Sequence, residues 1–167
     1  PEKNLKIISH PTDSQISSVK LALNLDFIKN KPLTFLSSDN IMVFDDSVAL
    51  SQSIPDNDFC VWTCSYYPIA KIKPQEYSWV KVSDENLIEN FLFKSNPSNL
   101  KLWRLVTGNF TFRNAGILEL LLGNLEREFD TSVREPMLDD LIPIALRLNL
   151  RVSSFDVKNY LTFLRLV

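Results

Sequence analysis

The sequence predicts one α/β domain, residues 1–167, built around a mixed β-sheet. Strand-like and helix-like segments alternate along the chain, 167 residues suit one domain, and no linker, repeat or low-complexity segment divides it. Apolar residues make up 45% of the chain and charged residues 23%, as in a globular protein with a packed core. A disordered chain, a collagen-like repeat and a disulfide-stapled scaffold are therefore excluded.

The first part of the chain is expected to form a strand at 5–9, a helix, and a buried strand at 33–37, which is the βαβ unit of a parallel sheet. The helix is indicated by apolar residues that recur at helical spacing: Val19, Ala22, Leu23 and Phe27. Further strands are expected at 59–63, 78–82, 87–94, 103–113 and 151–157.

A hairpin is predicted where Asp84-Glu85-Asn86 separates two of these strands. Helices are predicted at 115–128 and 138–148, each with apolar residues along one stripe. Pro143 lies inside the second pattern, so it either kinks that helix or marks its first turn.

Charge and glycine content exclude several classes of function. Lys plus Arg (18) nearly balances Asp plus Glu (20), so a nucleic-acid binder is not expected. No stretch is apolar enough to span a membrane, and the first residues lack a signal-peptide pattern. The three glycines, Gly108, Gly116 and Gly123, are too far apart for either glycine-rich phosphate loop within this chain.

The sequence also lacks the motifs of common catalytic and metal centres. His10 is the only histidine, and no G-x-S-x-G elbow accompanies it. If residues 59–64 form a strand, Cys60 and Cys64 share one face about 13 Å apart, too far for a disulfide. Two thiols and a distant histidine do not make a zinc site. We therefore expect a reduced, cytoplasmic protein.

Asp39 is the best candidate for chemistry, because ligands of open α/β sheets bind outside the carboxyl ends of strands. A carboxylate there can hold Mg²⁺ beside substrate phosphates. The alternative is a turn-forming Asp-Asn pair, which spacing alone favours. The hydroxyl-rich stretch 12–18 suits an anion or a nucleotide base, or serves as an ordinary N-cap. Glu135 is more open to function than the helix-start carboxylates Asp139 and Asp140.

Six short segments with distinct patterns follow one another along the chain. They are 12–18 (TDSQISS), 35–40 (FLSSDN), 77–82 (YSWVKV), 90–94 (NFLFK), 108–112 (GNFTF) and 135–141 (EPMLDDL). In this order they resemble the motifs of the sugar-phosphate nucleotidyltransferase family, whose members make NDP-sugars. The resemblance implies a Rossmann-like GT-A-type nucleotidyltransferase fold with a mixed sheet.

The chain also departs from that family. The family's first strand and its G-x-G-(S/T)-R loop, which cradles the triphosphate, are not in this sequence, so the chain resembles an incomplete domain lacking about the first 50 residues. Ser14 stands where the family has Gly, and Phe93 replaces the Glu that precedes Lys94. Leu164 stands at the Gly of the family's G-T-P turn, and a second metal-ligating Asp is not identifiable.

The resemblance implies a Mg²⁺-dependent transfer in which a sugar 1-phosphate attacks the α-phosphorus of an NTP and pyrophosphate leaves. Asp39 would hold the metal, and Lys94 would face the sugar phosphate. The implied nucleotide-binding residues are Thr12, Ser14, Gln15 and Asn40. The implied sugar-binding residues are Thr107, Gly108 and Glu135.

The expected partners are therefore an NTP and a sugar 1-phosphate, with a homo-oligomer left open. Two other functions stay open as well. One is a degenerate relative that binds nucleotide, sugar phosphate or partner proteins without catalysis. The other is a GT-A glycosyltransferase that uses Asp39 and an NDP-sugar donor, although Ser37-Ser38-Asp39 supplies no D-x-D motif.

Overall fold

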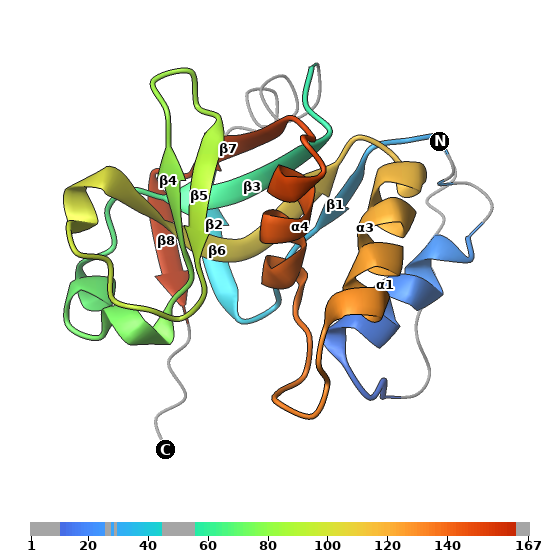
Figure 1. Ribbon diagram of the computed structural model, residues 1–167. Coiled ribbons are helices and arrows are strands. Elements are labelled where there is room, and N and C mark those ends of the chain that lie inside the picture. The colour runs from blue at the N-terminus through green and yellow to red at the C-terminus, as the bar shows by residue number, and fades with distance from the viewer. Residues whose placement is uncertain (1–10, 26–27, 29, 45–55, 163–167) are drawn as a thin grey trace.

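A six-stranded sheet forms the centre of the protein in a computed structural model, which describes residues 11–25, 28, 30–44 and 56–162 (Figure 1). Its order is β5-β4-β6-β3-β7, and β1 also pairs with β6. The strands are β1 (Leu33–Phe35), β3 (Phe59–Cys64), β4 (Trp79–Val82), β5 (Ile88–Leu92), β6 (Trp103–Phe112) and β7 (Val152–Asp156). The strand expected at 5–9 and the helical residue Phe27 lie outside the described residues.

The sheet is mixed, as predicted. β3 and β7 are parallel, whereas β6 runs antiparallel to β1, β3 and β4, and β4 and β5 form the predicted hairpin. β1 differs from the expected buried strand, because Thr34 is exposed and its two neighbours are only half-buried. The βαβ unit stays a prediction, since its first strand is not described.

β6 changes partner along one edge. Near its start Trp103 to Leu105 pair with β4, and near its end Phe110 to Phe112 pair with β1. β3 occupies the opposite edge at both places. The carboxyl end of β1 and the start of β4 therefore meet beside residues 106–109, a place that we call the fork.

Helices cover one face of the sheet. They are α1 (Gln15–Leu23), α3 (Ala115–Glu128) and α4 (Leu141–Arg147), and Figure 1 shows them together on one side of the molecule. The short 3-10 helix η5 (Leu138–Asp140) leads into α4, so Pro143 lies in the first turn of that helix. Among the described residues, no helix has the length and hydropathy needed to cross a membrane.

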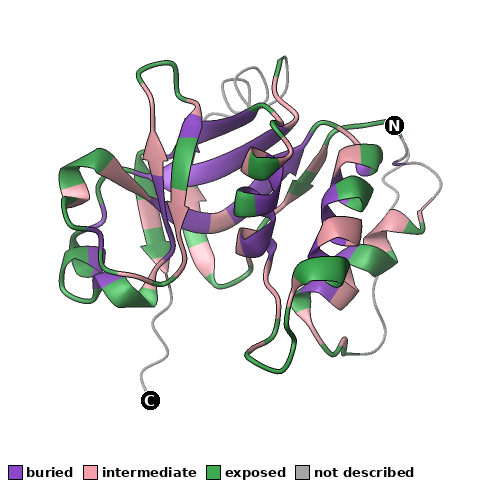
Figure 2. Cartoon of the chain, in the orientation of Figure 1, coloured by how far each residue is buried: buried purple, intermediate pink, exposed green. Residues whose placement is uncertain are grey.

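The alternating side chains of β3 feed two cores, because successive residues of a strand point to opposite faces. Phe59 and Val61 pack in the core under the helices, while Cys60, Trp62 and Cys64 pack on the other face. Figure 2 shows the central strands buried between these layers. Both cysteines are free thiols on one face, as predicted.

The second core is covered by a ribbon that the sequence analysis missed. β2 (Asn40–Val43) and β8 (Asn159–Thr162) form a separate antiparallel pair. Their inward side chains Met42 and Tyr160, with Phe44, pack against the second core. These four-residue strands carry no long apolar run, so their local pattern gave no strand signal.

Candidate functional site

Four of the predicted site residues gather at the fork. Asp39 lies in the turn between β1 and β2, Asn40 is the first residue of β2, and Thr107 and Gly108 belong to β6. The Asn40 side-chain Nδ2 donates to the Thr107 carbonyl at 2.9 Å. The segments that carry these four residues are therefore joined directly.

Asn109 is a further residue of the fork, and sequence reasoning missed it. It is fully buried, accepts from the backbone N–H of Ser37 at 2.6 Å, and donates to the Thr107 carbonyl at 3.0 Å. A buried amide with these partners ties the turn after β1 to the middle of β6. A polar residue within the apolar strand pattern of 103–113 was the available signal.

Gly108 lies at the fork, where the pairing of β6 with β3 is irregular. Its φ is +77°, a region in which a side chain is strained. A Cβ there would lie 3.7 Å from the Ser37 Cβ, which is ordinary contact, so the backbone angle rather than crowding requires glycine.

The Asp39 carboxylate is exposed at the fork instead of being buried in the core. Its Oδ1 accepts from the Ser37 hydroxyl and, at 3.5 Å, from Asn40 Nδ2. Asp39 thus braces its own turn while its side chain remains accessible. Such a carboxylate suits Mg²⁺, which is commonly bound by one or two carboxylates, water and substrate phosphates.

A complete protein cage for a metal is not found in the part of the chain that the structure describes. No group of three or more His, Cys, Asp or Glu side chains is placed to hold an ion there. Among the described residues, an ion at Asp39 would therefore have no second and third carboxylate, thiolate or imidazole ligand, and water or a bound phosphate could supply the remaining oxygens.

A cluster of three tyrosines lies beside Asp39 and was also missed. The Tyr67 ring contacts the Tyr160 ring edge-on at 5.1 Å and the Tyr77 ring at 5.9 Å. Burial, and then the charge of Asp39, raise the pKa of Tyr160. Burial and the neighbouring Tyr67 raise the pKa of Tyr77 to about 12. The Tyr160 and Tyr77 phenols therefore stay neutral at physiological pH.

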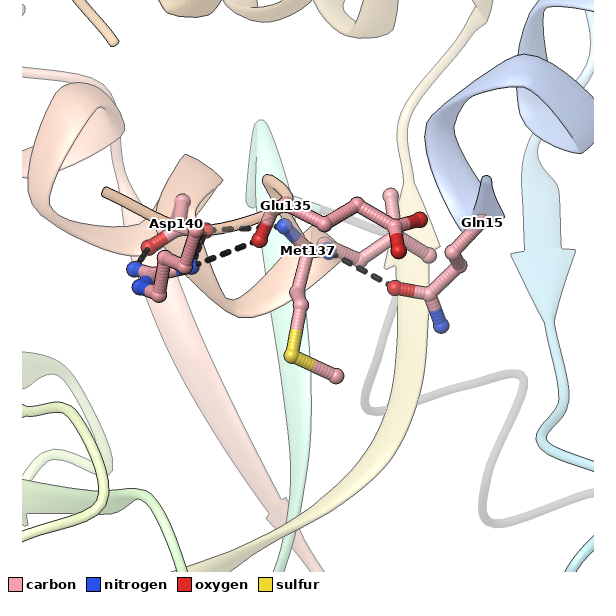
Figure 3. A network of polar contacts seen from close by, with 6 residues as sticks. Gln15, Glu135, Met137 and Asp140 are labelled. Atoms are coloured by element: carbon pink, nitrogen blue, oxygen red, sulfur yellow. Dashed lines mark hydrogen bonds and ion pairs between the residues drawn. The ribbon is translucent and has the colours of Figure 1, made fainter. Parts of the chain in front are cut away.

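Gln15 and Glu135 lie in a second group, around the segment that leads into η5 (Figure 3). The Gln15 Oε1 accepts from the backbone N–H of Leu138 at 2.9 Å, which joins the start of α1 to η5. Glu135 is exposed, and Figure 3 shows its carboxylate on the same side as the Gln15 amide. η5 packs against β6, so this group borders the strand that carries the fork.

Lys94 is exposed just after β5, where its backbone has a φ of +36°. It lies beside the second group, since the ring of the preceding residue, Phe93, packs against the Arg134 guanidinium. The Lys94 charge lowers the pKa of Asp139. Burial has the larger effect and raises that pKa overall. Gln15 and the segment that carries Lys94 thus contact the residues from 134 to 140, which include Glu135.

Thr12 and Ser14 lie at the start of α1 and form an N-terminal cap. The Ser14 Oγ accepts from the backbone N–H of Ser17 at 2.9 Å, and the Thr12 hydroxyl donates to the Ser14 carbonyl at 3.2 Å. The N-cap interpretation is therefore confirmed. A nucleotide-binding role for these hydroxyls stays a prediction.

The sequence matches no family model and no curated protein. The fold matches the solved structure of the inositol-1-phosphate CTP transferase from T. maritima, with a TM-score of 0.57 and 15% identity over 86% of this chain and 53% of that one. It also matches the nucleoside-diphosphate-sugar pyrophosphorylase from Vibrio cholerae RC9, with a TM-score of 0.54 and 14% identity over 78% of this chain and 51% of that one.

The chain therefore spans about half the length of each of these two structures. At such low identity the likeness concerns the arrangement of helices and strands alone. It shows that the chain has an α/β, mixed-sheet fold like that of sugar-phosphate nucleotidyltransferases.

Proposed function

We propose that this chain carries the sugar-phosphate side of a nucleotidyltransferase site, in a protein that joins an NTP to a sugar 1-phosphate and releases pyrophosphate. One observation carries the proposal. Asp39, Asn40, Thr107 and Gly108 meet at the carboxyl end of β1, the place where α/β sheets bind ligands. The likeness in fold to two nucleotidyltransferases supports the same class of reaction.

In this proposal Asp39 holds Mg²⁺, which neutralises phosphate charge when it is bound. The chain's own residues position the substrate. Asn109 and Asn40 hold the turn that presents Asp39, and Gly108, without a Cβ, leaves room for a sugar ring beside β6. Lys94 supplies a positive charge for the sugar phosphate.

Calorimetry tests this assignment with glucose 1-phosphate and each of the four common NTPs, with and without Mg²⁺. We expect Mg²⁺ to strengthen binding in the wild type, and Asp39→Asn to weaken binding about tenfold and remove the Mg²⁺ effect. Asp84→Asn, an exposed carboxylate in the β4–β5 turn, serves as the matched control and should change nothing. Equal binding by the Asp39 and Asp84 variants would contradict the assignment.

A binding module without catalysis is the second candidate. Two observations favour it. Phe93 stands where the family has a Glu before Lys94, and its ring packs against Arg134. The Gln15 Oε1 already accepts a hydrogen bond from the Leu138 backbone N–H. A pyrophosphate-release assay on the full-length protein distinguishes the two candidates. Mg²⁺-dependent release supports the enzyme, whereas ligand binding without release supports the module.

A further inference from the structure

We propose that Arg134 is a positioning residue that holds the segments carrying Lys94 and Glu135 in a fixed relation to each other. The effect of this positioning on ligand binding rests on the proposed function, in which Lys94 faces the sugar phosphate and Glu135 faces the sugar. The positioning itself can be tested without any ligand.

The Arg134 guanidinium joins three segments that are separate in the sequence. Its central carbon lies 3.7 Å from the centre of the Phe93 ring, just after β5, and 4.7 Å from the centre of the Phe129 ring, just after α3. Its two terminal nitrogens also bind both carboxylate oxygens of Asp140 in η5. A planar, charged group suits both kinds of contact, and a lysine would not reproduce them.

The partner carboxylate is itself fixed. Asp140 is only 7% exposed, and its Oδ2 accepts from the Met137 backbone N–H at 2.8 Å as well as from Arg134. The hydrogen bond with Asp140 raises the pKa of Arg134, so the guanidinium stays charged. Loss of Arg134 would leave a buried carboxylate without its counter-ion.

Both functional candidates are direct chain neighbours of residues that Arg134 holds. Lys94 follows Phe93, and its φ of +36° is a strained conformation that persists only where the surroundings fix it. Glu135 follows Arg134, and its carbonyl oxygen accepts from Arg134 Nη1 at 3.0 Å. The Arg134 guanidinium already contacts two aromatic rings and both carboxylate oxygens of Asp140. These contacts favour a positioning role over direct contact with a ligand.

The experiment compares Arg134→Gln and Arg134→Lys with Arg147→Gln. Arg147 forms an exposed ion pair with Glu128 between α4 and α3, so its variant controls for loss of a surface charge. Backbone hydrogen exchange is followed by mass spectrometry in peptides covering 90–96 and 134–140. We expect Arg134→Gln to speed exchange about tenfold or more in both peptides, Arg134→Lys to do so less, and the control to leave both unchanged.

Binding of glucose 1-phosphate by the same variants gives the second readout, with an expected loss of about tenfold for Arg134→Gln. Unchanged exchange in Arg134→Gln overturns the positioning role, and faster exchange with unchanged binding overturns its consequence for the site. If the wild type binds no sugar phosphate while exchange responds as expected, the proposed function fails and the positioning role stands.

Should Arg134→Gln lose its cooperative unfolding transition, Phe93→Leu replaces it, because this variant removes the ring that contacts both Arg134 and Lys94 and leaves the Arg134–Asp140 pair intact. We then expect faster exchange in the 90–96 peptide and weaker sugar-phosphate binding. No change in exchange there would overturn the proposal.

Discussion

At Gly108 the backbone adopts a φ of +77°, just before the residues of β6 that pair with β1. Three other described residues have a positive φ, namely Asn86, Lys94 and Asn149. Lys94 differs from the two asparagines, because asparagine is enriched at a positive φ, whereas a lysine backbone rarely adopts one unless neighbouring contacts hold it there. A residue with a positive φ therefore lies in each group of candidate site residues, and at Lys94 this backbone angle is strained.

Gly108→Ala should destabilise the protein by about 1 kcal/mol or more, because alanine is strained at this φ although its Cβ would meet no clash. Gly123→Ala is the matched control in α3. No atom lies within 4 Å of a Cβ there, so alanine should stabilise the helix by about 0.5–1 kcal/mol. Urea unfolding of both variants measures the difference, and the same sign for both would contradict the argument.

Asp139→Asn should stabilise the protein at neutral pH, because burial raises the pKa of the Asp139 carboxyl above its ordinary value of 3.8. Ionisation of this group therefore costs stability in the folded state. Well below pH 3.8 the carboxyl is protonated in both states, so stability is unaffected. As the pH rises above 3.8, the ordinary pKa of the unfolded state, the folded protein loses stability until the pH reaches the raised pKa of the folded state. Thermal unfolding of both proteins from pH 3 to 8 tests this prediction. If the stability of the variant relative to the wild type did not increase as the pH rises, the prediction would be wrong.

At the scale of elements, polar caps fix where the helices begin. The Ser14 Oγ caps α1, and the Asn114 Oδ1 accepts from the backbone N–H of Ile117 at 3.1 Å at the start of α3. α3 contributes four buried leucines to the core under the helices: Leu118, Leu121, Leu122 and Leu125. Their spacing along one stripe is what made this helix predictable from 115 to 128.

Asn114→Ala should lower the free energy of unfolding by about 1 kcal/mol, because it leaves a helix N–H without its side-chain partner. Asn124→Ala on the exposed side of the same helix is the control. It removes only a hydrogen bond to the Leu120 carbonyl, so its effect should stay within about 0.5 kcal/mol. Chemical denaturation compares the two, and equal losses would argue against the cap.

At the scale of the whole molecule, two cores share one sheet. β3 lies between them with all six residues buried, and its cysteines face the core under the β2–β8 ribbon. Burial raises the pKa of the Cys60 thiol to about 12, so little thiolate exists at neutral pH. Access to Cys60 therefore requires that the sheet or the ribbon open.

A thiol reagent should accordingly label Cys60 at pH 8 only as fast as the protein opens. We expect the labelling rate to rise with urea in parallel with unfolding followed by circular dichroism. Cys64 is also buried, so mass spectrometry must assign the labelled site. Labelling of Cys60 at the rate of an unfolded chain in the absence of urea would show that the second core is not closed.

The sequence named some of the residues that the structure places at the fork, and their functional roles stay predictions. The order of motifs selected Asp39, Asn40, Thr107 and Gly108, and the structure brings these four together. The sequence analysis missed Asn109, the tyrosine cluster and Arg134, because each makes its important contact with a residue that is distant in the sequence.

The sequence by itself determined the mixed α/β class, strands β3 to β7, helices α3 and α4, and the free thiols, since hydrophobic periodicity and capping are local properties of the chain. Only the tertiary structure decided that β1 and β4 share one edge of β6, that β2 pairs with β8, and that Arg134 stacks on Phe93. These are pairings between distant segments, and their stability comes from contacts that no local pattern encodes.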